Sequence, residues 1–215
     1  MAEPRLRISE IFHSVQGEST RIGLPTVFIR LTGCPLRCVW CDTEYAFTGG
    51  EMMSLSEVLA KVEEFSCKTV CVSGGEPLAQ KACIDLLAAL CDAGYSVSLE
   101  TSGALDIEEV DARVSRIMDL KAPDSGESSK NRWENIALLS AHDEIKFVLA
   151  SEADYAWAVD VLKREHLADR CTVLFSPVQG QLSPATLAEW VVRDHLPVRF
   201  QLQLHKVLWG SERAR

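Results

Sequence analysis

The sequence predicts an α/β fold, namely a partial TIM-type barrel of about six parallel strands with an N-terminal β extension. Apolar runs with the length of strands alternate with amphipathic helical segments along most of the chain. This alternation favours parallel strands joined by right-handed helical crossovers. Because 215 residues fit a partial barrel better than a complete eightfold one, we expect a single domain over residues 1–215.

The elements of the first half have recognisable start and stop signals. Ser54 followed by Glu57 forms a capping box, which begins a helix. Gly94 ends the next helix, because glycine favours the backbone conformation found just after a helix. We therefore expect strands at residues 6–12, 27–31 and 69–72, with helices from 54 to about 65 and from about 78 to 93.

The second half continues the same alternation. Strands are expected at residues 96–99, 116–120, 144–149, 172–175 and 198–202. Helices are expected at residues 107–114, 132–139, 152–165 and 184–193. Since the carboxyl ends of parallel strands meet at one edge of a barrel, we expect a ligand site there.

Charge and hydropathy exclude several classes of partner. The chain has 22 basic and 31 acidic residues, and its net charge of -9 repels nucleic acid. No apolar run approaches the roughly 18 residues of a membrane span, and the N-terminus lacks the apolar core of a signal peptide. We therefore expect a cytoplasmic protein without a nucleic-acid or membrane partner. In a reducing compartment its eight cysteines favour metal binding or free thiols over disulfides.

Three cysteines directly follow the predicted strand at 27–31. Cys34, Cys38 and Cys41 have C-x3-C-x2-C spacing, so one short loop can direct all three sulfurs toward zinc or an iron–sulfur cluster. A cubane cluster with three cysteines keeps one iron open, whereas structural zinc needs a fourth ligand, such as His13 or His205. Trp40, just before the last cysteine, either packs in the core or offers an aromatic face to a nucleobase.

A second motif, Gly74 to Pro77, follows the predicted strand at 69–72. A plain tight turn is one interpretation of Gly-Gly-Glu-Pro. The alternative is a ligand contact, because glycines let the backbone approach a ligand and Glu76 supplies a carboxylate acceptor. The ammonium group of a bound amino acid would need such acceptors.

Together the two motifs resemble those of the radical S-adenosylmethionine (SAM) superfamily. That superfamily has a C-x3-C-x-aromatic-C loop and a Gly-Gly-Glu-Pro strand end, and the resemblance implies the radical SAM fold. Within it, the chain is similar to the 7-carboxy-7-deazaguanine synthase family. The segments that carry this second resemblance are residues 11–18, 28–34, 41–43, 100–103 and 203–206.

The resemblance implies two cofactors, a 4Fe–4S cluster and SAM. Cys34, Cys38 and Cys41 would hold the cluster, and its open iron would bind the methionine part of SAM, which is cleaved to a 5′-deoxyadenosyl radical. The residues implied to contact SAM lie beside the cysteines and at strand ends: Trp40, Cys41, Asp42, Gly75, Ser102, Asp119, Leu120 and Lys121.

The resemblance also implies the substrate, 6-carboxy-5,6,7,8-tetrahydropterin. A radical SAM lyase of this family converts the pterin to 7-carboxy-7-deazaguanine with loss of ammonia, in queuosine biosynthesis. Arg30 suits the pterin carboxylate through a charge-assisted fork. The further residues implied to contact the pterin are Val15, Gln16, Gly17, Glu18, Ser73 and His205. For His205, the alternative is a hydrogen-bonded histidine in the core.

A magnesium ion, an electron donor and a second subunit are also implied. Thr43 would be one ligand of Mg2+, and the substrate and waters would be the others. The alternative role for the Thr43 hydroxyl is to cap a helix or to stabilise a turn. The family implies a flavodoxin as reductant and a homodimer. The sequence departs from the family at Ser19, where glycine is usual, and at Leu204, where threonine is common.

Two other functions compete with this hypothesis. A glycyl-radical-enzyme activase shares the cysteine loop but acts on a protein, and residues 16–18 with His205 and Lys206 argue against it. A non-catalytic zinc or iron–sulfur module would leave Gly74 to Pro77 unexplained.

Overall fold

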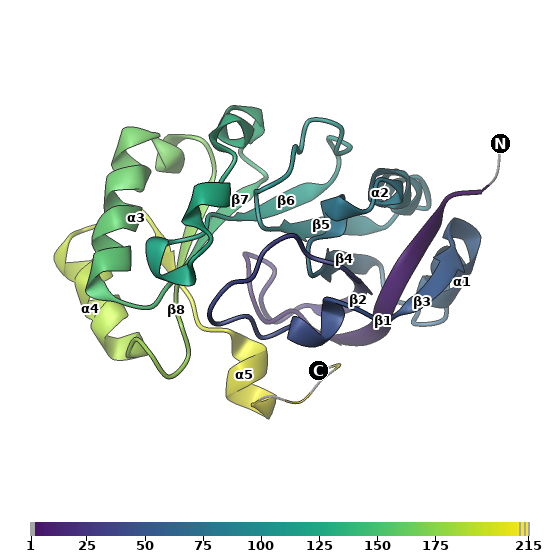
Figure 1. The fold of residues 1–215 in the computed structure, drawn as a ribbon, viewed down its shortest axis with the longest axis horizontal. Helices are drawn as coiled ribbons and strands as arrows, with labels where there is room; N and C mark the ends of the chain where they lie inside the picture. Colours follow the sequence, from purple (N-terminus) through teal and green to yellow (C-terminus); the bar gives the residue numbers. More distant parts are fainter. Residues whose placement is uncertain (1–2, 211, 213, 215) are drawn as a thin grey trace.

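The computed structural model of the protein describes residues 3–210, 212 and 214 (Figure 1). In this part of the chain, one sheet contains nine strands in the order β3 (Glu51–Ser54), β1 (Arg5–Val15), β2 (Pro25–Leu31), β4 (Thr69–Gly74), β5 (Ser96–Thr101), β6 (Ser115–Asp119), β7 (Glu144–Leu149), β8 (Thr172–Pro177) and β9 (Arg199–Phe200). The neighbours from β2 to β9 are parallel, whereas β1 is antiparallel to β2 and β3. The predicted α/β fold with an N-terminal β extension is confirmed.

The strands differ from the prediction mainly at the two ends of the sheet. β3 was not predicted, because its four residues are too few for a clear alternation, and it pairs only with β1. The strand expected at 198–202 is reduced to the two residues of β9, which pair with β8 at the edge of the sheet.

Most predicted helices are present: α1 (Leu55–Glu63), α2 (Ala82–Asp92), α3 (Glu152–Arg164) and α4 (Pro184–Arg193). Ser54 caps α1 as expected, because its side chain accepts from the Glu57 amide and the Glu57 carboxylate accepts from the Ser54 amide. Residues 77–79 form a separate short 3-10 helix before α2 begins. Residues 133–138 are also 3-10 rather than α-helical.

The helix expected at residues 107–114 is wrong. Two aspartates compete with the helix there, since the carboxylate of Asp106 accepts from the Glu108 amide and that of Asp111 accepts from the Arg113 amide. Such local side-chain bonds favour turns. The apolar residues that suggested a helix, Ile107, Val110 and Val114, are nevertheless buried in the core.

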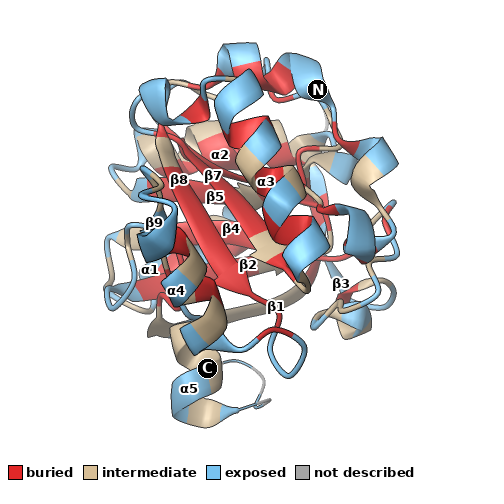
Figure 2. Cartoon of the chain, turned by 90° about the vertical axis from the view of Figure 1, so that its left-hand side faces the viewer, coloured by how far each residue is buried: buried red, intermediate tan, exposed pale blue. Residues whose placement is uncertain are grey.

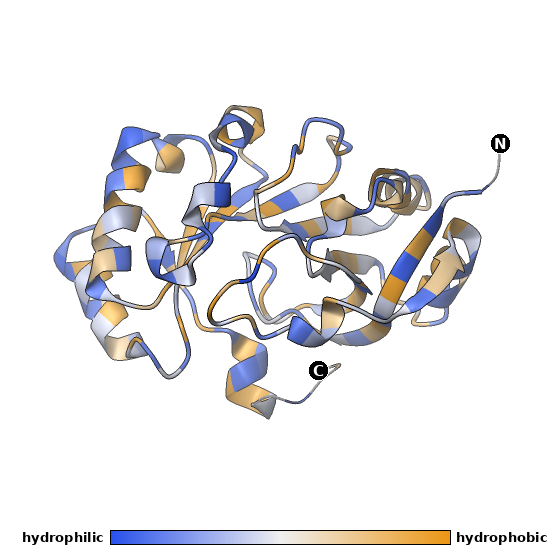
Figure 3. Cartoon of the chain, viewed as in Figure 1, coloured by the Kyte–Doolittle hydropathy of each residue, from blue (hydrophilic) through white to orange (hydrophobic). Residues whose placement is uncertain are grey.

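The parallel strands have one face in the core and the other toward a cavity. On β7, Ile145, Phe147 and Leu149 are buried, whereas Lys146 and Val148 line the cavity. Figure 2 shows buried residues along the central strands, with exposed residues on the outer faces of α3 and α4. Figure 3 shows the same contrast in hydropathy, because α2 is mostly apolar and α3 has a hydrophilic outer face. The core therefore lies between the sheet and the helices.

A last helix, α5 (Leu204–Trp209), was not predicted. Its first amide, that of Leu204, donates to the carbonyl of Gly17 over 2.9 Å, which joins the C-terminal segment to the turn between β1 and β2. In the described part of the chain, no helix combines the length and the apolar character needed to cross a membrane.

Candidate active site

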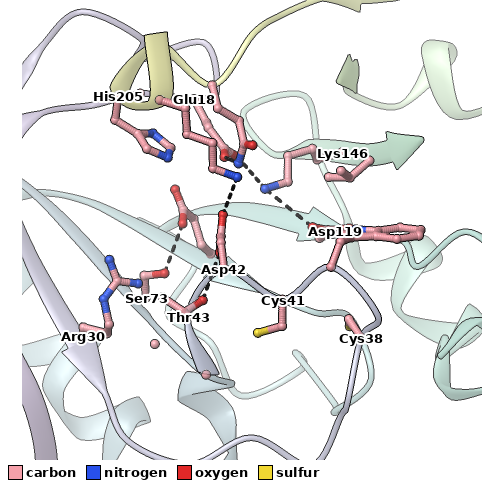
Figure 4. Close-up of a pocket in the computed structure, with 18 of the residues that line it drawn as sticks. Glu18, Arg30, Cys38, Cys41, Asp42, Thr43, Ser73, Asp119, Lys146 and His205 are labelled. Atoms are coloured by element: carbon pink, nitrogen blue, oxygen red, sulfur yellow. Dashed lines mark hydrogen bonds and ion pairs between the residues drawn. The ribbon is translucent and has the colours of Figure 1, made fainter. Parts of the chain in front are cut away.

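A cavity of about 470 Å³ lies at the carboxyl ends of the parallel strands (Figure 4). This is the edge of the sheet at which parallel α/β folds bind ligands. The structure brings together there all but one of the predicted site residues: Val15, Gln16, Gly17, Glu18, Arg30, Cys34, Cys38, Trp40, Cys41, Asp42, Thr43, Ser73, Gly75, Ser102, Asp119, Lys121 and His205.

Leu120 is the exception, because its side chain does not line the cavity. Its side chain is fully buried in the core, and its amide donates to the carbonyl of Lys146. Side chains alternate between the two faces along an extended segment. Because Asp119 and Lys121 face the cavity, Leu120 between them faces the core.

The cysteine loop is held in shape by its own backbone and by its neighbours. Gly33 has a φ of 100°, which glycine adopts readily, and its amide donates to the carbonyl of Ala46 over 2.7 Å. Within the loop, the Cys41 amide donates to the carbonyl of Cys38, and Figure 4 shows these two side chains on the same side of the cavity. The loop thus presents its three thiols to one space.

This donor set suits a cluster better than a single zinc ion. Among the described residues, no three His, Cys, Asp or Glu side chains form a group that could hold one metal ion. Zinc requires its ligands within about 2.0 to 2.3 Å. His13, one of the two histidines considered as a fourth ligand, instead lies against the ring of Phe65, with ring centroids 6.1 Å apart. A zinc site completed by His13 is therefore wrong.

The thiols must lose their protons before they can bind iron. Burial raises the pKa of Cys34 and of Cys38, and the ammonium of Lys121 opposes this increase. Binding of a cluster therefore displaces protons from the loop, as metal binding to cysteine generally does.

Gly75 is required where β4 meets the cysteine loop. Its amide donates to the carbonyl of Leu31, and the next amide, that of Glu76, donates to the carbonyl of Gly33 over 2.8 Å. A Cβ atom at Gly75 would lie 2.3 Å from the carbonyl oxygen of Gly33 and 2.7 Å from the Cβ of Cys34. Only glycine therefore lets this strand end pack against the first cysteine.

Glu76 does not present its carboxylate to a ligand, contrary to the hypothesis from the sequence. Its side chain is fully buried and accepts hydrogen bonds from the Thr101 hydroxyl over 3.0 Å, the Ser102 amide over 2.7 Å and the Leu78 amide over 3.0 Å. The Ser102 hydroxyl is also bonded to it. Glu76 thus joins the ends of β4 and β5, and holds Ser102 at the cavity.

Replacing Glu76 with alanine is expected to lower the free energy of unfolding by about 3 kcal/mol or more, because it leaves several buried donors without an acceptor. Urea unfolding followed by circular dichroism measures the change. The exposed Glu109→Ala variant is the control, with an expected change of less than about 0.5 kcal/mol. Equal stability of the two variants would contradict the structural role of Glu76.

The turn between β1 and β2 directs its polar side chains into the cavity. The side-chain amide of Gln16 donates to Glu100, while its backbone carbonyl accepts from Gly23 over 2.9 Å. Ser19 has a φ of 67°, a left-handed conformation that glycine adopts at lower cost. This explains why glycine suits that position and shows that the turn keeps its form with serine.

Arg30 reaches the cavity from β2 and is held from one side. Its Nε donates to the carboxylate of Glu10 over 2.7 Å, and its guanidinium carbon lies 5.9 Å from the ring centroids of both Phe12 and Tyr45. Among the residues that the structure describes, the terminal nitrogens of Arg30 make no hydrogen bond. They are therefore available to an anionic group in the cavity.

Glu100 is a cavity residue to which the sequence motifs give no role. It lies on β5 and accepts from the Ser73 hydroxyl over 3.0 Å and from Gln16 over 3.4 Å. The alternation along β5 could have indicated it, since the buried Leu99 and Thr101 flank it.

Two lysines surround Asp119 at the end of β6. The Lys121 ammonium lies 3.1 Å from Oδ2 of Asp119, and the Lys146 ammonium lies 3.5 Å from the same atom. The other oxygen, Oδ1, is buried and has no partner among the described residues. Asp119 thus keeps one acceptor that no described protein group occupies, as a ligand with a hydrogen-bond donor would need.

The C-terminal helix α5 covers the cavity beside the cysteine loop. The Lys206 ammonium lies 2.7 Å from Oδ2 of Asp42. Although burial opposes ionisation, this cation lowers the pKa of Asp42 to about 2. The alternation patterns did not indicate that Lys206 reaches the cavity, because Lys206 and its partner Asp42 are 164 positions apart in the sequence.

His205 faces the cavity and is not a core histidine. A Cβ atom on Gly17 would lie 2.2 Å from its Nδ1, so the missing side chain makes room for the imidazole. Burial lowers the pKa of His205, which keeps the ring neutral at pH 7. In the described part of the chain the ring makes no hydrogen bond, and its nitrogens remain available.

The fold and the cysteine loop define the class of protein. The model of the Radical SAM superfamily matches residues 28–180. QueE from Escherichia coli has the same fold, with a TM-score of 0.77 and 22% identity over 94% of this chain and 95% of its own. The chain is thus a radical SAM protein, and this class implies a 4Fe–4S cluster and SAM.

Two curated relatives identify the family within this class. The 7-carboxy-7-deazaguanine synthase of Chlorobaculum tepidum is 47% identical over 98% of this chain and 97% of its own length. The 7-carboxy-7-deazaguanine synthase of Koribacter versatilis is 40% identical over 96% of this chain and 98% of its own. The chain belongs to the 7-carboxy-7-deazaguanine synthase family, whose members are lyases. These matches favour an enzyme over a non-catalytic module, and this family over the activases.

Proposed function

We propose that the protein converts 6-carboxy-5,6,7,8-tetrahydropterin into 7-carboxy-7-deazaguanine with loss of ammonia, as a step of queuosine biosynthesis. The observation that carries the proposal is one cavity that is lined both by the three cysteines and by Arg30, Gln16 and Glu18. A cofactor and an anionic heterocycle could therefore occupy it together.

We assign the cofactor end to the cysteine loop and the neighbouring strand ends. Cys34, Cys38 and Cys41 would hold the cluster, and the free Oδ1 of Asp119 would accept from the amino group of SAM. When bound, the cluster and SAM supply the radical that removes hydrogen from C6 of the pterin. The remaining SAM contacts proposed here are Trp40, Asp42, Gly75, Ser102 and Lys121.

The other end of the cavity offers the groups that a carboxylated pterin needs. The terminal nitrogens of Arg30 would bind the carboxylate as a fork, while Glu10 fixes the opposite edge of the guanidinium. Glu18, Gln16 and the backbone of Val15 and Gly17 would present acceptors and donors to the pterin edge. Ser73 and the neutral His205 complete this end of the site.

Thr43 is our candidate for a Mg2+ ligand. Its hydroxyl lines the cavity and donates to Oδ1 of Asp42 over 3.2 Å. Thr43 precedes the 3-10 helix at Glu44–Ala46, but its side chain makes no capping hydrogen bond, so the capping alternative is wrong. A hydroxyl that faces the substrate suits Mg2+, which keeps several waters and takes few protein ligands.

The proposal includes two partners on the strength of the family resemblance alone. The electron donor would be a flavodoxin, and the functional unit would be a homodimer. Reduction of the reconstituted enzyme by a flavodoxin and its elution volume in size-exclusion chromatography test these two points.

The conversion itself is the central test. Anaerobic, reconstituted enzyme with dithionite, SAM and the carboxy-tetrahydropterin is expected to form 7-carboxy-7-deazaguanine, detected by mass spectrometry. Added Mg2+ should increase the rate, and Thr43→Val should reduce that increase because it removes the hydroxyl ligand. Absence of the deazaguanine acid in every condition would refute the function. An identical response of Thr43→Val to Mg2+ would refute only the metal assignment.

A further inference from the structure

Lys146 is a buried cation in the cavity that the proposed reaction does not use. It lies on β7, where Glu144 is the other charged residue, and only 8% of its surface is exposed. Its ammonium is bonded to Oε2 of Glu18 and lies 3.5 Å from Oδ2 of Asp119 (Figure 4). It therefore stands between the proposed substrate end and the proposed cofactor end.

The carboxylate of Glu18 is held on both of its oxygens. Oε2 accepts from Lys146, and Oε1 accepts from the side-chain amide of Gln203. Burial alone would raise the pKa of Glu18, but the Lys146 ammonium and these two hydrogen bonds keep it below its usual value. A carboxylate fixed in this way stays ionised and keeps one orientation.

Strand β7 anchors the turn at a second point. Glu144 lies two residues before Lys146, so the two side chains extend from the same face of the strand. Both oxygens of Glu144 accept from the Thr20 amide, over 3.1 and 3.0 Å, and one accepts from the Thr20 hydroxyl. Because Thr20 is already held, the contacts with Lys146 and Gln203 set the direction of the Glu18 side chain.

Asp119 depends less on Lys146 than Glu18 does. It has a second cation, Lys121, at 3.1 Å, whereas Lys146 is the only cation paired with Glu18 among the described residues. Loss of the Lys146 ammonium would therefore affect mainly the substrate end of the cavity.

We propose that Lys146 is a positioning residue for the substrate, which acts by holding the carboxylate of Glu18 in the orientation that binds the heterocycle. This inference rests on the proposed function, because it takes Glu18 as a contact of the pterin. Lys146 itself would not touch the reacting atoms.

The test measures the affinity for the pterin by anaerobic calorimetry, with the cluster and SAM bound and no reductant, so that no turnover occurs. Lys146→Met is expected to raise the pterin Kd at least about tenfold, and Glu18→Gln to have a similar effect. If Lys146 acts through Glu18, the double variant should lie within about threefold of Glu18→Gln alone. The affinity for SAM should change by less than about threefold, because Asp119 keeps Lys121.

Two further variants separate positioning from stability. Arg116→Met removes the cation of another buried pair, in which Arg116 lies 2.6 Å from Asp143 away from the cavity. It should destabilise the fold but leave the pterin Kd unchanged. Lys146→Arg keeps the charge and should bind the pterin more tightly than Lys146→Met. If Lys146→Met does not fold, the pterin Kd of the double variant is compared with that of Glu18→Gln to test the proposal. Neither of these two proteins has an unpaired carboxylate at position 18.

An unchanged pterin Kd in Lys146→Met would overturn the proposal. The proposal would also be overturned if the effects of the two single variants on the pterin Kd added fully in the double variant. It would likewise be overturned if Lys146→Met lost as much affinity for SAM as for the pterin. Failure of the wild-type enzyme to convert the pterin would instead refute the proposed function, and the two results are therefore distinguishable.

Discussion

Replacing Cys38 with alanine is expected to abolish 5′-deoxyadenosine formation and to deplete the reconstituted protein of iron. The three thiols come from one short loop and face one cavity, so the variant keeps only two of the ligands that a cluster needs. Iron content and the broad absorbance near 400 nm report the cluster, with about four irons expected in the wild type. Chromatography of the reaction mixture reports cofactor cleavage.

The matched control is Cys67→Ala. Cys67 does not line the cavity, and its thiol donates to the carbonyl of Pro25 over 3.3 Å. This variant should keep the wild-type iron content and SAM cleavage. The assignment of the cluster to the loop would be wrong if Cys38→Ala retained both properties, or if the wild type bound zinc and stayed colourless under reconstitution.

Replacing Arg30 with alanine is expected to weaken pterin binding roughly 10- to 100-fold, because a charge-assisted fork to the carboxylate is lost. The affinity for SAM should stay near the wild-type value, since Arg30 is bonded to Glu10 and is not among the residues proposed to contact SAM. Calorimetry without reductant separates the two affinities, and the KM for the pterin provides a second measurement.

The substitution also removes one of the two partners of the Glu10 carboxylate, which accepts from the Tyr45 hydroxyl as well. A control must therefore report the loss of the ion pair alone. Glu10→Gln breaks the ion pair with Nε of Arg30 but leaves the terminal nitrogens in place. We expect this variant to bind the pterin with most of its affinity, and Arg30→Lys to recover only part of what alanine loses, because an ammonium cannot form the fork. Normal pterin turnover by Arg30→Ala would show that the substrate carboxylate lies elsewhere.

Most strands and helices were predictable because their patterns are local. The apolar run of β4, the capping box of Ser54 and Glu57, and the proline-initiated α4 are each specified within a few residues. The failures have physical causes. Asx bonds from Asp106 and Asp111 override the helical spacing at 107–114, and α5 is too short to show a periodicity of its own.

The site was predictable as far as motifs reach. The cysteine spacing, the strand ends and the family resemblance together placed all assigned residues at the cavity except Leu120, whose side chain the strand alternation directs into the core. Glu76 does not offer its carboxylate to a ligand as the motif suggested, because that carboxylate joins β4 to β5. Glu100, Lys146 and Lys206 belong to the cavity but had no assigned role, since their partners are distant in the sequence.

The sequence by itself determined the alternation of strands and helices, the cysteine loop and the family resemblance, because each depends on residues close together in the chain. Only the tertiary structure decided which charges meet. Lys146 pairs with Glu18 across 128 residues, and Lys206 pairs with Asp42 across 164. Such pairs form because the barrel brings β7, the first turn and the C-terminal helix to one cavity, where partial exclusion of solvent strengthens the attraction between the paired charges.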